Sequence, residues 1–124
     1  MIIIIFRQVL CEVLIKDQIF VFTGGPGFGK TMLIKYFASA GYKVGYEVAG
    51  EIIQEQREKG GTLLPEKDIR SFQNEVLKRR IDFFNSVSAD ENAFSDRGIP
   101  DQIAYARYHG FGTPAFLDRN AKEY

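Results

Sequence analysis

The chain has 124 residues, 45% of them hydrophobic and 26% charged, so we expect one globular domain with an ordinary core. Sixteen basic and sixteen acidic residues give zero formal net charge, which argues against a chain-wide field for binding nucleic acid or a membrane surface. The single cysteine, Cys11, excludes an internal disulfide and fits a reducing cytoplasm.

The N-terminal segment is apolar but differs from a targeting sequence. Residues 1–6 lack the basic start of a signal peptide, and Arg7 interrupts them too early for a membrane span. We therefore expect a cytoplasmic protein without a transmembrane helix. Residues 1–17 are interpreted as an N-terminal extension and residues 18–124 as a partial nucleotide-binding domain.

Two structures fit residues 9–15. Their Ile and Val content favours a strand that runs antiparallel to residues 19–23, with Lys16 and Asp17 between them. The spacing of the apolar residues also fits a continuous helix. Periodicity alone leaves both alternatives open.

A glycine-rich loop follows an apolar run at residues 19–22. The stretch TGGPGFGKT fits the Walker A pattern, because four residues separate Gly24 from the Gly29-Lys30-Thr31 triplet. Such glycines let backbone N–H groups wrap a phosphate chain, and the N-terminus of the next helix faces the same anion. Lys30 is expected to reach the β- and γ-phosphates and Thr31 to hold Mg²⁺. The predicted nucleotide-binding residues are Gly24, Gly25, Pro26, Gly27, Phe28, Gly29, Lys30, Thr31 and Met32.

The next elements alternate between helix and strand. We predict a helix over residues 30–40, a strand over 42–47 and a helix over 49–59 that Gly60 ends. Apolar residues at three- and four-residue steps predict a long helix over 66–87, with Pro65 at its entry. A short strand over 93–96 and a helix over 101–108 follow, and residues 114–124 are expected to begin a further helix.

This alternation predicts an α/β fold of the P-loop NTPase type, with a parallel sheet between layers of helices. Ligands of such sheets bind at the carboxyl ends of the strands. Thr23, Glu47 and Asp96 all fall at predicted strand ends. Their coincidence indicates a site around the glycine-rich loop.

Asp96 and Arg97 are the second candidate pair. A carboxylate beside the loop strand can hold Mg²⁺, and an arginine can neutralise a transferring phosphoryl group. Alone, the pair would indicate only the start of a turn; beside a Walker A loop, we favour a functional role.

Further polar residues each allow a functional and a structural interpretation. Glu47 could accept a proton from a substrate hydroxyl or be a surface residue beside a helix start. Gln73 could read a polar group of the substrate, although an ordinary polar helix position fits slightly better. His109 fits a surface residue better than a catalyst, and Lys78-Arg79-Arg80 fits a solvated face better than a nucleic-acid patch.

The ordered stretches FTGGPGFGKT, YEVAGEIIQEQ, SFQNEVLKRR and DRGIPDQIAYARYHG resemble the small bacterial P-loop ATPases described as predicted ATPases or AAA-type domains. The resemblance covers about residues 19–112. That family is similar in turn to nucleoside and nucleotide kinases of the P-loop class. In those relatives, groups matching Glu47, Phe72-Gln73 and Asp96-Arg97 surround the phosphoryl acceptor.

The resemblance implies ATP binding with Mg²⁺, and either hydrolysis or phosphoryl transfer to a small hydroxylated acceptor. The residues implied in catalysis are Lys30, Glu47, Asp96 and Arg97; those implied at the acceptor are Glu47, Phe72, Gln73 and Arg97; those implied at the metal are Thr31 and Asp96. The alternatives are a regulatory nucleotide-binding module without catalysis, or an inactive fragment. ATP is preferred to GTP by default, because no N-K-x-D motif is present.

Members of the family continue with two more strands, a lid that carries arginines and an adenine-binding loop. Their absence after Tyr124 indicates a C-terminally truncated domain. It would leave the glycine-loop strand at an edge of the sheet. We expect residues 9–15 to cover that edge.

Overall fold

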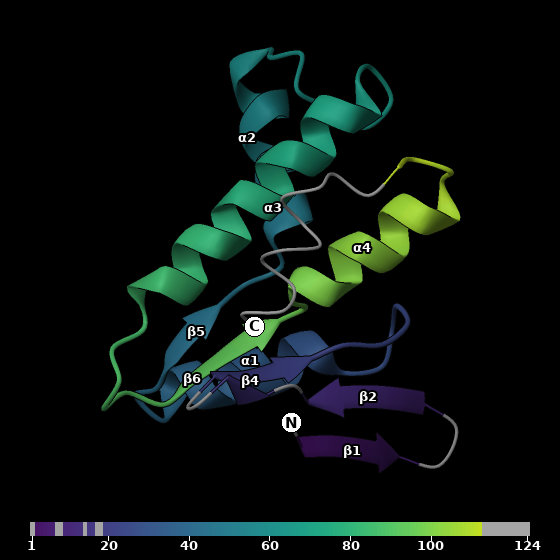
Figure 1. Ribbon diagram of the computed structural model, residues 1–124. Helices are drawn as coiled ribbons and strands as arrows, with labels where there is room; N and C mark the ends of the chain where they lie inside the picture. Colours follow the sequence, from purple (N-terminus) through teal and green to yellow (C-terminus); the bar gives the residue numbers. More distant parts are fainter. Residues whose placement is uncertain (1, 7–8, 14, 17–18, 113–124) are drawn as a thin grey trace.

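The computed structural model describes residues 2–6, 9–13, 15–16 and 19–112, and it describes side chains from residue 19 onward. The predicted helix over residues 114–124 lies outside this part of the chain. Figure 1 shows a small sheet with helices on both of its faces and a separate N-terminal hairpin. The α/β architecture agrees with the fold predicted from the sequence.

Three strands form a parallel sheet in the order β5, β6, β4. Strand β4 (Ile19–Phe22) pairs with β6 (Ala93–Asp96), and β6 pairs with β5 (Lys43–Gly45). The register places Phe22 opposite Asp96, so the carboxyl ends of β4 and β6 lie level. The glycine-rich loop and the Asp96-Arg97 turn therefore leave the sheet side by side.

Helix α1 (Lys30–Ser39) covers one face of the sheet through aromatic packing. Buried Phe22, Ile34 and Phe94 form this cluster, and Phe37 stacks on Phe94 with ring centroids 3.7 Å apart. Stacked aromatic rings add a specific geometry to the burial of apolar surface. This packing fixes the axis of α1 and hence the direction in which its N-terminus points.

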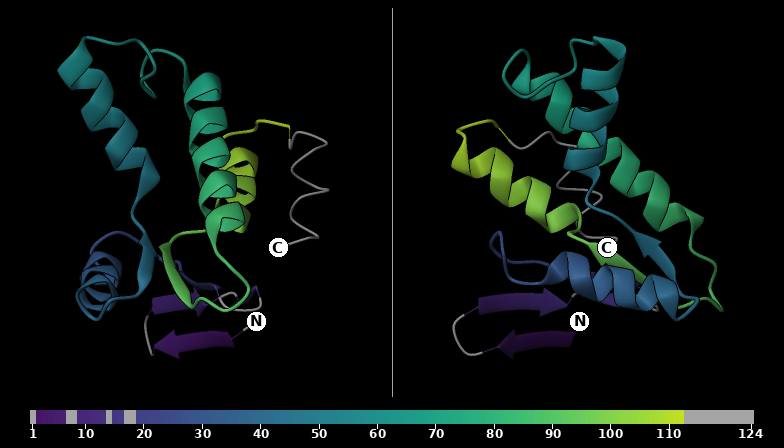
Figure 2. Two further views of the ribbon diagram at one scale, coloured as in Figure 1. Left: turned by 90° about the vertical axis from the view of Figure 1, so that its left-hand side faces the viewer. Right: turned by 180° about the vertical axis from the view of Figure 1, so that it is seen from behind.

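Helix α3 (Ile69–Ser86) covers the opposite face, as Figure 2 shows. Its C-terminal half buries Phe84 against Ile19, Val21 and Ala93. Alternate residues of β4 therefore face opposite helices, which is the strand period of two.

The N-terminal half of α3 extends beyond the sheet and packs on two other helices. Phe72 and Val76 contact residues of α2 (Val48–Lys59), and Leu77 contacts Ile99 of α4 (Ile99–Tyr108). One long helix thus joins the sheet to both α2 and α4. The predicted periodicity of this segment is confirmed.

Two helix boundaries have clear local causes. Gly60 ends α2 in a left-handed conformation with φ of 64°, as its glycine predicts. The start of α3 is later than predicted, because Asp68 caps the helix by accepting a 3.0 Å hydrogen bond from the Ser71 N–H. Pro65 lies in the turn before this cap instead of at the helix entry.

The N-terminal residues form strands, so the helical alternative is wrong. Strand β2 (Val9–Val13) pairs with β1 (Ile2–Phe6) in an antiparallel hairpin. Only the two-residue strand β3 (Ile15–Lys16) pairs antiparallel with β4. The expected cover of the β4 edge is therefore confirmed for Ile15 and wrong for residues 9–13.

Candidate functional site

The glycine-rich loop joins β4 to α1. Gly27 and Gly29 have φ angles of 80° and 81°, a left-handed conformation that residues with a Cβ rarely adopt. Gly29 is the residue before α1, and no side chain caps this helix start. The N–H groups of the first turn, from Lys30 to Met32, are consequently free of side-chain caps and suited to an anion.

The Lys30 side chain lies within this loop. It is only 8% exposed, and its Nζ donates a 2.6 Å hydrogen bond to the Gly25 carbonyl. A buried ammonium group beside uncapped N–H groups favours the binding of an anion at this loop. Pro26, Phe28 and Met32 lie on its outer side, where the Met32 side chain is 76% exposed.

Asp96 and Thr31 meet at the carboxyl end of β6. The Thr31 Oγ1 lies 3.5 Å from Asp96 Oδ2, at the limit of a hydrogen bond. Asp96 is 2% exposed, and its Oδ1 has no hydrogen-bond partner among the described residues. Burial raises the pKa of Asp96 above its ordinary value, while the charge of Lys30 opposes that rise.

Arg97 lies in a strained turn directly after Asp96. Its φ of 69° is the one positive value outside glycine in the described residues. Its N–H donates a 2.7 Å hydrogen bond to the Phe22 carbonyl, and its own carbonyl accepts one of 2.8 Å from Ser95 Oγ. The Arg97 guanidinium lies 3.6 Å from Asp101 Oδ1.

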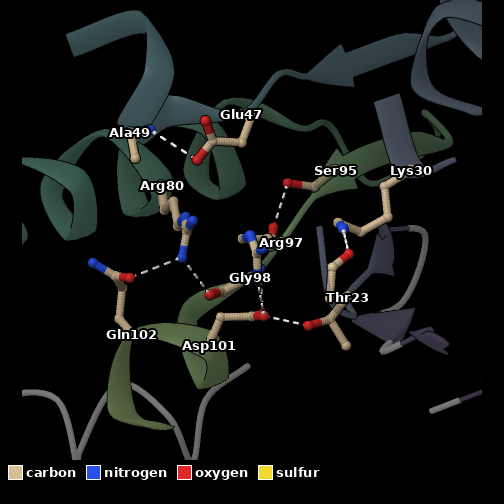
Figure 3. A network of polar contacts seen from close by, with 11 residues as sticks. Thr23, Lys30, Glu47, Ala49, Arg80, Ser95, Arg97, Gly98, Asp101 and Gln102 are labelled. Carbon is tan, nitrogen blue, oxygen red and sulfur yellow. Dashed lines mark hydrogen bonds and ion pairs between the residues drawn. The ribbon is translucent and has the colours of Figure 1, made fainter. Parts of the chain in front are cut away.

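Glu47 is the residue before α2, and it caps that helix. Its Oε1 accepts a 3.2 Å hydrogen bond from the Ala49 N–H, and its Oε2 accepts one of 2.7 Å from the Gly50 N–H. The Glu47 charge also contributes to the raised pKa of Asp96. Glu47 therefore stands near the loop with both oxygens already engaged, as Figure 3 shows for the Ala49 contact.

The structure separates Phe72 from Gln73. Phe72 is 3% exposed and packs between α2 and α3, where its ring belongs to the core and contacts Val48 and Ile52. Gln73 faces α4, and its Oε1 accepts a 2.7 Å hydrogen bond from Gln102 Nε2. The implied contact of Phe72 with a substrate thus conflicts with the burial of its ring.

A family profile described as an AAA domain matches residues 19–124. The chain belongs to this AAA domain family. Membership implies a P-loop NTPase core that binds nucleotide, in agreement with the loop, the helix start and the parallel sheet. Neither a curated protein nor a solved structure gives a significant match.

One polar residue next to the glycine-rich loop, Asp101, was given no role from the sequence. Asp101, at the start of α4, accepts hydrogen bonds from Thr23 and, at 2.8 Å, from the Gly98 N–H. The available signal was its position three residues after Gly98 and directly after Pro100, where an acidic side chain can cap the start of a helix.

Arg80 lies in the interior, so its predicted place on a solvated face is wrong. It is 3% exposed and bonds to Gly98 and Gln102. The signal was its position four residues after Val76 and four before Phe84, which places it on the buried stripe of α3. Arg79 points elsewhere, to ion pairs with Glu55 and Glu75.

A cavity of about 200 Å³ opens between α3 and the ends of β5 and β6. It is lined by polar and aromatic side chains, among them Tyr46, Glu51, Arg80, Phe83 and Ser95. Its lining includes Tyr46, the residue before Glu47, and it lies on the α3 side of the sheet.

The predicted surface position of His109 is confirmed, since that residue is exposed. No helix in the described residues is long and apolar enough to cross a membrane.

Proposed function

We propose that this AAA domain binds ATP with Mg²⁺ and supports transfer of the terminal phosphoryl group to a small hydroxylated acceptor. The observation that carries the proposal is the orphaned Oδ1 of buried Asp96 beside the Thr31 hydroxyl. A buried, unpaired carboxylate oxygen costs free energy unless a cation or donor completes it. The Walker A loop next to it supplies the phosphate side of the same site.

The donor set suits Mg²⁺. Thr31 and Asp96 offer a hydroxyl and a carboxylate, which are hard oxygen ligands. Among the described residues there is no group of three His, Cys, Asp or Glu that could hold a metal without help. Mg²⁺ commonly takes one or two protein oxygens and completes its shell with water and substrate phosphates. Bound there, it would neutralise charge on the phosphates.

The loop residues hold the phosphates in this proposal. Lys30 Nζ would exchange the Gly25 carbonyl, 2.6 Å away, for phosphate oxygens. The exchange would give the ammonium group an anionic acceptor in place of a neutral carbonyl, which adds charge–charge attraction to the hydrogen bond. The first-turn N–H groups of α1 point to the same anion, and Gly24–Gly29 would form the surrounding backbone.

Arg97 and Glu47 flank the acceptor side. The Arg97 guanidinium would balance charge that develops on the transferred phosphoryl group. Glu47 would orient the acceptor hydroxyl through a lone pair that its two capping hydrogen bonds leave free. The cavity beside Tyr46 and Ser95 offers room for a small acceptor.

A second candidate function is a nucleotide-binding module without catalysis. Two observations favour it: both Glu47 oxygens cap α2, and the Arg97 guanidinium already faces Asp101. Hydrolysis of ATP, with water as the acceptor, stands between the two candidates. All three share nucleotide binding and differ in turnover.

Titration calorimetry with ATP and GTP, with and without Mg²⁺, tests the shared part. We expect binding that weakens when Mg²⁺ is removed and a preference for ATP; no heat with either nucleotide would refute it. Phosphate release and phosphoryl transfer to a panel of nucleosides and sugars then separate the candidates. Transfer to one panel member supports the kinase-like proposal, and phosphate release without transfer supports hydrolysis. The absence of both activities supports the binding module.

A further inference from the structure

Arg80 is a buried arginine at the junction of α3, α4 and the Asp96-Arg97 turn. Its Nη1 donates hydrogen bonds of 3.0 Å to the Gly98 carbonyl and 3.1 Å to Gln102 Oε1, as Figure 3 shows. It forms no ion pair with any described residue, and its Nε has no partner among them. The guanidinium therefore contacts a backbone carbonyl and an amide instead of a carboxylate.

Fold stability alone explains this arginine poorly. Burial lowers the pKa of Arg80, and the charges of Asp101 and Glu47 compensate only from a distance. A hydrophobic side chain of similar volume would avoid the desolvation cost, as replacements of buried ion pairs often do. The buried guanidinium of Arg80 is better explained by the segment that it contacts.

It holds the turn that carries the predicted metal ligand. Arg97 has a left-handed backbone between Asp96 and Gly98, and such strain persists only where neighbouring structure enforces it. The described hydrogen bonds around the turn come from the sheet through Phe22, from Ser95, from α4 through Asp101, and from α3 through Arg80. Arg80 supplies the contact from α3.

A second row of contacts fixes Arg80 itself. Gln102 Oε1 accepts from Arg80, and Gln102 Nε2 donates 2.7 Å to Gln73 Oε1 and 3.3 Å to the Gln73 carbonyl. The chain of hydrogen bonds thus runs from Gln73 on α3 to Gln102 on α4, returns to Arg80 on α3 and ends at the Gly98 carbonyl. A change at Gln73 on the acceptor side reaches Gly98 through two side chains.

We propose that Arg80 is a positioning residue, whose hydrogen bond to the Gly98 carbonyl holds the turn so that Asp96 and Arg97 face the phosphate site. The assignment rests on the proposed function for its catalytic consequence. Its structural part concerns the protein without nucleotide and can be tested separately.

Amide hydrogen exchange of the nucleotide-free protein tests the structural part. Arg80→Met should speed exchange at the Arg97 and Gly98 amides roughly tenfold or more, because a hydrogen bond to a charged donor is lost. The Leu33 amide, bonded to the Gly29 carbonyl at 3.1 Å, should change by less than about twofold. Lys78→Met, which removes an exposed charge two residues before Arg80 on the same helix, is the matched control and should change the exchange of none of these amides.

The catalytic part needs a separation of binding from turnover. Arg80→Met should lower kcat roughly tenfold or more while KM for ATP stays within about twofold, because the Walker A loop is untouched. Arg80→Lys keeps the charge on a shorter side chain without the planar guanidinium that now reaches Gly98 and Gln102, and it should give an intermediate kcat. If Arg80→Met does not fold, Arg80→Lys carries both measurements.

The outcomes are distinguishable. Unchanged exchange at Arg97 and Gly98 overturns the positioning role, whatever the activity. Uniformly faster exchange across α1 and the turn overturns it too, since that indicates general destabilisation. If exchange in Arg80→Met is faster at the Arg97 and Gly98 amides alone and the wild type is inactive, the positioning role is supported and the proposed turnover is refuted. If exchange is faster at these two amides alone and Arg80→Met keeps the kcat of the wild type, only the catalytic part of the proposal is overturned.

Discussion

The loop lysine gives the sharpest test of nucleotide binding. Lys30→Ala removes an ammonium group that is 8% exposed and bonded to the Gly25 carbonyl at 2.6 Å. In the nucleotide complex the lost contact is a charge-assisted hydrogen bond worth about 1.5–3 kcal/mol. Since about 1.4 kcal/mol corresponds to tenfold in affinity, Kd for ATP should rise roughly tenfold to 150-fold.

The assay is titration calorimetry with Mg²⁺ and ATP, repeated with Lys35→Ala as the control. Lys35 lies on the same helix and is exposed, so its loss should leave Kd within about twofold. Thermal unfolding without nucleotide should differ little among the three proteins, because the Lys30 hydrogen bond lies in the loop and outside the core. Equal affinities of wild type and Lys30→Ala would refute the phosphate site. Equal losses of ATP affinity in Lys30→Ala and Lys35→Ala would show that the net positive charge matters, and not the position of Lys30.

Burial raises the pKa of Asp96, so its carboxyl stabilises the fold only at low pH, and this stability is lost as the pH rises through the raised pKa. Without metal at neutral pH, Asp96→Asn should therefore unfold at the same temperature as the wild type or at a higher one, and the difference should shrink towards pH 3.8. The variant should also lose the stabilisation that ATP with Mg²⁺ gives the wild type. A clearly lower melting temperature of the metal-free variant would contradict this. Glu47→Ala should destabilise the protein by about 1 kcal/mol in chemical unfolding because α2 loses its cap, whereas Glu58→Ala at the other end of α2 should not. Gly45→Ala should cost about 1–3 kcal/mol, because its Cβ would lie 2.9 Å from the Phe83 ring, and an unchanged denaturation midpoint would show that the ring moves freely.

The fold was predictable where local sequence and global structure agree. The glycine-rich loop combines a strand, a special backbone and a helix start within a dozen residues, so its context could be read directly. The apolar period of three and four predicted α3 for the same reason. The carboxyl-end rule then predicted that Thr23 and Asp96 would lie at the same edge of the sheet, as the pairing of Phe22 with Asp96 shows.

The rest depended on packing between distant segments. Arg80 follows Arg79 in a basic run, and only the way α3 packs against α4 decides that one is buried and the other faces α2. Residues 9–13 are apolar enough to pair with several neighbours, and the sequence does not distinguish β1 from β4 as the partner. Both misses come from tertiary choices that leave no local pattern.

The level ends of β4 and β6 also determine when the site can form during folding. The register joins Ile19 to Ala93, so the whole α1–α3 segment must be made before these parallel strands can pair. Closing so long a loop costs chain entropy before any contact compensates it, which makes such pairings late events. A ribosome-bound chain that ends before β6 would carry a complete glycine-rich loop without the carboxylate opposite it, and its capacity to retain nucleotide with metal should appear only after β6 has emerged.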